Sequence, residues 1–338
     1  MISQELLEQL EVAKKRGDLD TQIEVLRQLL SLVQQNGEVV GEIEVLRLLG
    51  NVYHEKDQLQ KAHSYRVTAV QLAENNRSQC PPEEFMSVYC DLGRSFIEVH
   101  DWVNAEIHTQ HAFELAQSLQ NIRAKCICKI NFELIYVNTG RKQEAFRLGE
   151  DVLREAEHLQ DHYVQGLQHL NLANFFLHEL KLNVSQRHAK QALAHAELSE
   201  DVQLRMRTQN ILGKIFHRAR LLTGRIEYST EAENYLQQTV ESARSLGNLS
   251  LEADAETEFA NFWEYRHKLD KANVHYQRAL ELLEKIRSQL GYEKFQLTYF
   301  RSFQPIYEKF TEFLLRQTQS NLAFLSAEQL RSRLLLAL

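Results

Sequence analysis

The chain has 338 residues, of which 43% are apolar and 25% charged, with only 3 Pro and 12 Gly. This composition is typical of a helical globular protein and excludes collagen-like, low-complexity and turn-rich β architectures. A formal charge of −7 does not provide the strongly basic face that displaces counterions from a phosphate backbone. We therefore expect an all-α protein that has no nucleic-acid partner.

The N-terminal sequence MISQELLEQLEVAKKRGDLD mixes acidic and polar residues, whereas a secretory signal needs a continuous apolar stretch. No window reaches the roughly 18 uninterrupted apolar residues of a membrane-spanning helix. The four cysteines contain no CxxC pair, a pattern that favours buried thiols in a reducing compartment. We therefore expect a cytoplasmic protein with no membrane partner.

Two amphipathic segments open the chain, at residues 3–16 and 20–35, and Gly17 and Asp18 separate them. Their apolar residues follow helical spacing, so they predict one pair of helices. Because this pair only weakly resembles the units that follow, we interpret residues 1–41 as a degenerate N-terminal cap.

A small residue followed three positions later by an aromatic recurs along the chain at intervals of 40 to 47 residues. The pairs are Gly50/Tyr53, Gly93/Phe96, Ala173/Phe176, Gly213/Phe216 and Ala260/Trp263, with a weaker copy at Glu133/Tyr136. Small residues on one helical face let a partner helix approach, and the aromatic fills the space beside it. The pattern therefore predicts six stacked helix pairs over residues 42–287.

After each small residue and its aromatic come a short polar turn and a second helix that carries alanines, such as Ala62 and Ala69. With Leu49, Gly50 and Tyr53 as the L-G-x-x-Y motif, this order resembles the tetratricopeptide repeat (TPR) family. The resemblance implies a right-handed α-solenoid of about seven helix pairs, with a period of about 40 residues and extra C-terminal helices.

Two copies depart from the family pattern. Glu133 stands where a small residue belongs, which predicts looser or differently staggered packing at that copy. The fifth copy has additional residues around LLTGRIE, which predict a longer turn or extra helical turns.

Residues 288–338 predict two further helices outside the repeat register, with a bend or helix boundary at Pro305 because proline removes a backbone donor. The segment 284–338, through IRSQL, Phe300, Phe303, Tyr307 and AExxRSRxLL, resembles the link between a TPR array and a CHAT domain, a caspase-like peptidase module. The catalytic His and Cys of that module have no counterpart here. We expect the apolar ending LLLAL to be covered by a partner, by a following domain, or by folding back on the last repeat.

No G-x-S-x-G elbow, Walker loop, dinucleotide fingerprint or H-E-x-x-H motif occurs in the sequence. The pairs His158/His162 and His108/His111 have helical spacing but no further ligand cluster nearby. The sequence thus predicts no catalytic residue, no cofactor and no metal site.

In a curved stack of helix pairs the first helices line the concave side, where a ligand groove forms. The inward positions predict a partner-binding groove made of Arg47, Asn51, Ile127, Ile130, Leu134, Leu167, Leu170, Asn174, Arg207, Asn210, Lys214 and Asn261. We expect a protein or peptide ligand, with apolar anchors in the middle and a carboxylate at Arg207 and Lys214. Asn174 and Asn210 would bond the ligand backbone.

Two structural alternatives to this groove stay open. The middle apolar residues are equally consistent with a covered interior, and Arg207 with a simple ion pair to Asp254. For function, the leading hypothesis is a non-catalytic binding scaffold or adaptor. The alternatives are the sensor arm of a CHAT-type peptidase and a peptide-responsive signalling regulator, although no N-terminal helix-turn-helix is recognisable.

Overall fold

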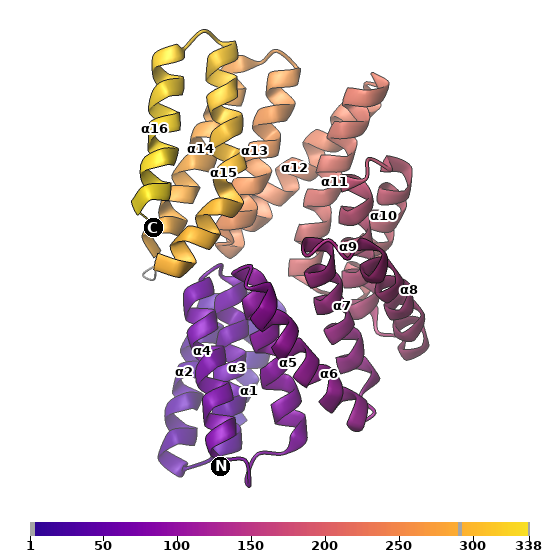
Figure 1. The fold of residues 1–338 in the computed structure, drawn as a ribbon, viewed down its shortest axis with the longest axis vertical. Coiled ribbons are helices and arrows are strands. Elements are labelled where there is room, and N and C mark those ends of the chain that lie inside the picture. The colour runs from indigo at the N-terminus through magenta and orange to yellow at the C-terminus, as the bar shows by residue number, and fades with distance from the viewer. Residues whose placement is uncertain (1–3, 290–292, 337–338) are drawn as a thin grey trace. The chain divides into compact units, whose positions relative to one another are not determined.

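The computed structural model describes the backbone of residues 4–289 and 293–336 and the side chains of residues 4–288 and 304–332. These residues form helices joined by short turns, and the described part of the chain contains no strand (Figure 1). The chain divides into two compact units, Met1–Thr208 (unit 1) and Gln209–Leu338 (unit 2).

Unit 1 consists of consecutive helix pairs that pack as antiparallel neighbours (Figure 1). Its helices are α1 (Gln4–Arg16), α2 (Leu19–Asn36), α3 (Val39–Glu55), α4 (Leu59–Asn75), α5 (Pro82–Glu98), α6 (Trp102–Ser118), α7 (Ile122–Asn138), α8 (Lys142–Leu159), α9 (His162–His178), α10 (Leu182–Leu198) and the start of α11 (Val202–Thr223). The first pair, α1 and α2, coincides with the two segments predicted before residue 41.

Unit 2 contains the rest of α11 and five further helices. They are α12 (Glu227–Leu246), α13 (Leu249–Tyr265), α14 (Leu269–Gln289), α15 (Glu293–Arg316) and α16 (Ser320–Leu336). The prediction of an all-α, TPR-like solenoid is confirmed. The division into a cap, six repeats and a C-terminal part, at residues 41 and 287, stays a prediction.

The glycines of the repeat motif lie where two helices of a pair touch. A Cβ atom added to Gly93 on α5 would stand 2.6 Å from Thr109 Oγ1 and 3.0 Å from the Thr109 backbone nitrogen on α6. At Gly50 on α3 the added atom would lie 3.0 Å from Cγ of Arg66 on α4. The missing side chain is therefore what allows each pair to pack closely.

Glu133 shows how the copy without a small residue on its first helix is built. Its side chain is only 4% exposed and extends from α7 toward Gly149 on α8, where an added Cβ would stand 3.2 Å from Glu133 Oε1. The small residue of this pair is thus on the second helix, and packing here differs from the other copies. Burial raises the pKa of Glu133 to about 7, although Gln168 and Asn171 offset part of the effect.

The additional residues of the fifth copy lengthen helices. Helix α11 has 22 residues and α12 has 20, whereas the first helix of a typical pair, such as α9, has 17. Gly224, with φ of +73°, lies in the short turn between them. Of the two predicted outcomes, extra helical turns are the one observed.

Pro305 lies inside α15, so of the two predicted outcomes the helix boundary is wrong, and the bend stays a prediction. A proline inside a helix costs roughly 3 kcal/mol, but the residues that follow it are strongly anchored. Ile306 and Tyr307 are 7% and 1% exposed and belong to an apolar core with α13 and α14. Tyr307 also donates a hydrogen bond of 2.9 Å to Glu284 Oε1. Tertiary packing therefore holds the helix together across the proline.

Part of the C-terminal resemblance falls where side chains are not described. Those of Phe300, Phe303 and Leu334–Leu338 lie outside the described residues, so the predicted covering of the apolar ending stays a prediction. Across the helices that can be assessed, no helix combines the length and the apolar character needed to cross a membrane.

We predict that Gly93→Ala lowers the free energy of unfolding by about 1–3 kcal/mol, because the new methyl group would clash with Thr109. In an open helix the same change would raise stability by roughly 0.5–1 kcal/mol. A loss of stability would therefore indicate the close contact with Thr109. Urea unfolding measures it. Gln117→Ala, at an exposed position of α6, is the control; a stabilising effect of Gly93→Ala would contradict the packing described.

Candidate functional site

The first helices of unit 1 form one continuous row. Helix α3 contacts α5, α5 contacts α7, and α7 contacts α9, in addition to the contacts of each with its own second helix. In a solenoid, the layer whose members touch one another is the inner layer of the curve. The inward faces of these helices therefore form the concave surface of unit 1.

Residues at the end of α3 and at the start of α11 influence one another electrostatically. Burial, and then the charge of Asp201 on α11, raise the pKa of Glu55 on α3 to about 7. The two carboxylates therefore lie close enough for their charges to interact.

A buried carboxylate connects the helices at one side of this concave surface. Glu98 on α5 is approached by His54 Nδ1 at 3.0 Å, Arg66 Nη1 at 3.2 Å and Arg94 Nε at 3.5 Å. Burial alone would raise the pKa of Glu98, but these neighbours hold it well below its usual range. Since the Arg66 side chain is only 1% exposed, Glu98 is the counter-ion of a buried cation.

Arg94 on α5 and Arg207 on α11 influence one another electrostatically. Arg94 also interacts with Tyr163 on α9, and the carboxylates of Glu98 and Asp201 act on Arg207 as well. Arg207 is exposed, and among the residues that the structure describes no ion pair or hydrogen bond is formed by its guanidinium group. Partial desolvation, and then the positive charge of Arg94, lower the pKa of Arg207.

Three of the predicted apolar anchors are used for packing. Ile130 is 3% and Leu170 5% exposed, and Leu167, at 7%, shares an apolar core with Ile130 and Val152. Such side chains offer almost no area to a ligand, which favours the covered interior over the groove, the two interpretations that the sequence left open. Ile127 and Leu134 are half-buried.

The predicted polar positions of unit 1 divide into bonded and available ones. Arg47 Nε lies 2.9 Å from Asp91 Oδ2 and its Nη1 3.5 Å from Glu84 Oε2. Asn51 accepts a hydrogen bond of 3.2 Å from Arg66. Asn174, by contrast, is exposed on α9. Asn174 and Arg207 are thus the predicted residues best placed to meet a ligand.

The predicted residues of unit 2 are engaged with that unit's own side chains. Lys214 and Asn210 both bind Asp254, the latter with an Nδ2 to Oδ2 distance of 2.7 Å. Asn261 accepts a hydrogen bond of 2.7 Å from the hydroxyl of Tyr276. Lys214 is therefore already neutralised, and its predicted role as a carboxylate anchor is not favoured.

Sequence reasoning missed Arg94, Tyr163 and Glu55. A signal existed for Arg94, because it follows Gly93 as Asn51 follows Gly50 and so occupies an equivalent inward position. Tyr163 and Glu55 lie near helix ends, outside the inward positions that the repeat defines. Their closeness to α11 depends on curvature, which a single repeat does not encode.

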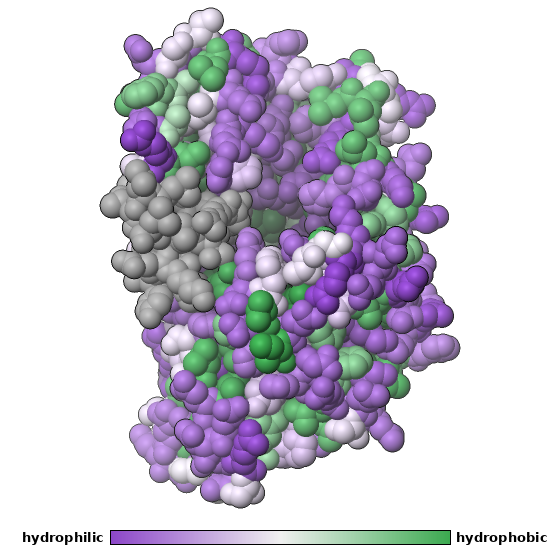
Figure 2. Space-filling view, viewed as in Figure 1, coloured by the Kyte–Doolittle hydropathy of each residue, from purple (hydrophilic) through white to green (hydrophobic). Residues whose placement is uncertain are grey.

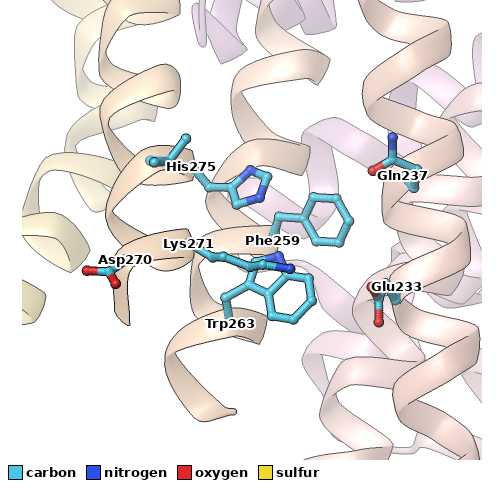
Figure 3. A pocket seen from close by; sticks show the side chains of 8 residues that line it. Glu233, Gln237, Phe259, Trp263, Asp270, Lys271 and His275 are labelled. Atoms are coloured by element: carbon cyan, nitrogen blue, oxygen red, sulfur yellow. The ribbon is translucent and has the colours of Figure 1, made fainter. Parts of the chain in front are cut away.

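Unit 2 holds a separate open pocket of about 450 Å³. Figure 3 shows the rings of Phe259 and Trp263, from α13, facing the gap between α12 and α14. The ammonium of Lys271 stands 4.0 Å from the centre of the Trp263 ring. The face of this ring is therefore already covered by a cation of the same chain. The molecular face in Figure 2 is mostly hydrophilic, with scattered apolar groups.

Histidines take part in ring stacking. Between α9 and α10, His162 Nδ1 lies 3.3 Å from His195 Nδ1 and His169 Nδ1 lies 3.0 Å from His188 Nδ1. His108 stacks on Phe96 with ring centres 5.3 Å apart. Within the described part of the chain, no group of three or more His, Cys, Asp or Glu side chains is arranged to hold a metal ion.

No protein-family model matches the chain. No curated protein matches it in sequence either. Solved structures do resemble its fold. The Rap conjugation gene regulator of plasmid pLS20 in complex with the Phr* peptide shares 16% identity at a TM-score of 0.64, covering 97% of this chain and 95% of that one.

The quorum sensor NprR resembles the chain in two states. NprR with its cognate peptide NprX shares 13% identity at a TM-score of 0.63, covering 97% of this chain and 86% of that one. The apo form from B. thuringiensis shares 13% identity at 0.53, covering 82% and 86%. At such identities these similarities establish the fold alone.

We predict that Glu98→Gln destabilises the protein by roughly 3 kcal/mol, because it leaves the buried cation of Arg66 without its counter-charge. Thermal and urea unfolding measure the effect. Glu114→Gln, an exposed carboxylate on α6, is the control. Equal stability of the two variants would show that the Arg66 charge is balanced elsewhere.

We also predict loss of stability in mild acid. Burial, and then His188 and His195, lower the pKa of His169 to about 4, whereas an unfolded histidine titrates near ~6.5. The contribution of neutral His169 to the free energy of unfolding is thus complete above about pH 6.5. It declines as pH falls toward 4, by roughly 1.4 kcal/mol per pH unit. His169→Phe should flatten this slope and the exposed-site control His158→Phe should not; parallel slopes for the two variants would contradict the assignment.

Proposed function

We propose that this chain is a non-catalytic, cytoplasmic scaffold that binds a peptide or an extended protein segment on the concave surface of unit 1. The observation that carries the proposal is the continuous row of first helices from α3 to α9. It presents exposed polar side chains such as Asn174, and Arg207 is exposed on the next first helix, α11.

The chemistry of the surface suits an extended chain. A peptide backbone brings a regular series of N–H and C=O groups that amide and guanidinium side chains can bond. Since the middle apolar residues Ile130, Leu167 and Leu170 are buried, affinity would come mainly from polar contacts. Recognition of this kind depends on the direction and charge of the ligand.

Solved structures of similar fold support the proposal in a general way. NprR is described with its cognate peptide NprX, and the pLS20 Rap regulator with the Phr* peptide. The two peptides are ligands of those two proteins and identify no ligand for this chain. The similarity supports the idea that an array of this fold and length accommodates a peptide. It also favours the peptide-responsive regulator as a second candidate, in which an occupied surface would fix the curvature of unit 1.

The resemblance of residues 284–338 to a TPR-to-CHAT link supports a third candidate, the sensor arm of a caspase-like peptidase. Tagging the N-terminus in the source cell and measuring the intact mass of the product separates it from the others. A mass near 39.5 kDa supports a separate scaffold. A larger product that continues into a domain with a catalytic His and Cys supports the sensor arm.

We predict that Asn174→Trp weakens peptide binding at least tenfold, about 1.4 kcal/mol, because the bulky ring would occupy the concave surface. A pool of randomised heptapeptides is first selected on the immobilised full chain, and fluorescence anisotropy with the best-retained peptide then gives the affinity. The matched control is Asn183→Trp, an exposed asparagine on the second helix α10, which should bind normally. Equal affinities for the two variants would place the site elsewhere.

A further inference from the structure

We propose that four stacked histidines between α9 and α10 act as a pH-sensitive latch, which releases α10 from α9 in mild acid while α8 stays packed. Two of the rings, His162 and His169, come from α9, and two, His188 and His195, come from α10. The latch is a property of unit 1 alone and needs no bound peptide, so it goes beyond the proposed function.

The rings form one continuous column. The two histidines of each helix are seven residues apart, which places them on one helical face. His162 Nδ1 lies 3.3 Å from His195 Nδ1, and one turn layer further His169 Nδ1 lies 3.0 Å from His188 Nδ1. The stacked rings of His195 and His169, with centres 5.7 Å apart, connect the two pairs. Phe176 ends the column by stacking on His188, with ring centres 5.6 Å apart.

The side chains that α10 buries most fully are small, so the rings are among the larger groups at this interface. Small side chains remove little apolar area from water, and each therefore contributes little to holding the helix in place. The hydroxyl of Ser185 adds a hydrogen bond of 2.6 Å to the backbone oxygen of Ala173. The buried side chains of α10 are those of Ser185, Ala189, Ala192 and Ala196.

The contacts within the column require neutral rings. Each Nδ1 to Nδ1 contact is a hydrogen bond in which one ring donates its N–H and the other accepts with its lone pair. A pair with one additional proton can still share it between the two nitrogens. When both rings of a pair are charged, two N–H groups and two positive charges face each other, and the hydrogen bond becomes a repulsion.

Burial favours the neutral form of these rings. Burial, and then His188 and His195, lower the pKa of His169 to about 4. Burial also lowers the pKa of His188 and the pKa of His195. A free imidazole titrates near ~6.5, so the rings bind protons more readily when α10 has separated. Opening is therefore favoured as pH falls below about 6.5 and suppressed above it.

The charged neighbours of the column leave this balance in place. Glu157 on α8 favours the charged form of His195, but His162 opposes it. Arg187 on α10 disfavours the charged form of His188. One carboxylate on α8 thus acts against one permanent cation and the other rings of the column.

Two further elements touch α9 or the end of the column. Glu133 on α7 interacts with Gln168 on α9, and burial raises its pKa to about 7, so it loses its negative charge in the same acid range. Lys181, at the start of α10, places its Nζ 5.8 Å from the centre of the Phe176 ring. Neither group supplies a negative charge that would stabilise protonated rings in acid.

The test measures hydrogen–deuterium exchange of the full chain at pH 7 and pH 5 by mass spectrometry, corrected for the intrinsic exchange rate at each pH. Exchange of protected amides reports how often a helix opens. Because His169 alone gains affinity for a proton when the column opens, we expect the opening constant of α10 to rise at least about tenfold from pH 7 to pH 5.

Helix α8 is the internal control. The side chains it buries are also small, and none of them is a histidine; they are Ala145, Gly149, Val152 and Ala156. The protection of α8 should not fall from pH 7 to pH 5. Equal loss of protection in α8 and α10 would mean that acid unfolds unit 1 as a whole, and it would overturn the latch without the use of any variant.

The deciding variant combines His169→Phe with His188→Phe, which keeps two stacked rings and removes their titration. It should abolish most of the acid-induced opening of α10. His158→Phe, at an exposed position of α8, is the matched control and should open as the wild type does. If the double variant is not folded at pH 7, His188→Gln replaces it, since a neutral amide can still bond His169. Acid-induced opening of the folded variant to the wild-type extent would show that the rings are not the latch.

Discussion

Close contact between the two helices of each pair is the constraint on which this structure depends. At Gly50 and Gly93 the absence of a side chain lets the second helix approach, and Glu133 with Gly149 meets the same need with the small residue on the opposite helix. Because the pairs are held in this way, the first helices can form a continuous row. The inward faces of α3, α5, α7 and α9 therefore lie side by side on one surface.

The fold could be predicted from sequence because its determinants are local. Small residues, aromatics and alanines at fixed spacing report a contact within one helix pair, and repetition of the contact gives the solenoid. The lengthening of helices by the additional residues of the fifth copy, and the continuation of α15 through Pro305, were harder to predict. Both depend on competition between a local preference and the packing of distant residues, and at Tyr307 packing prevails.

The candidate site was predicted only in part, for a physical reason. The repeat register defines which residues point inward, and Asn174 and Arg207 are exposed there. It does not define how neighbouring copies pack, and that packing buries Leu167 against Ile130 and Val152. Ion pairs between neighbouring copies, such as Lys214 with Asp254, likewise depend on the stagger of the helices. Which inward polar side chains remain available to a ligand can therefore be learned only from the structure.

The central claim, that the concave surface of unit 1 receives a peptide, is tested most directly by site-specific photocrosslinking. A photoreactive phenylalanine derivative is placed at Asn174 on the inner helix α9 or at Asn183 on the outer helix α10, both exposed. The account predicts that a peptide retained by the full chain becomes attached at position 174 and not at position 183. Attachment at 183 alone, or equally at both positions, would contradict it.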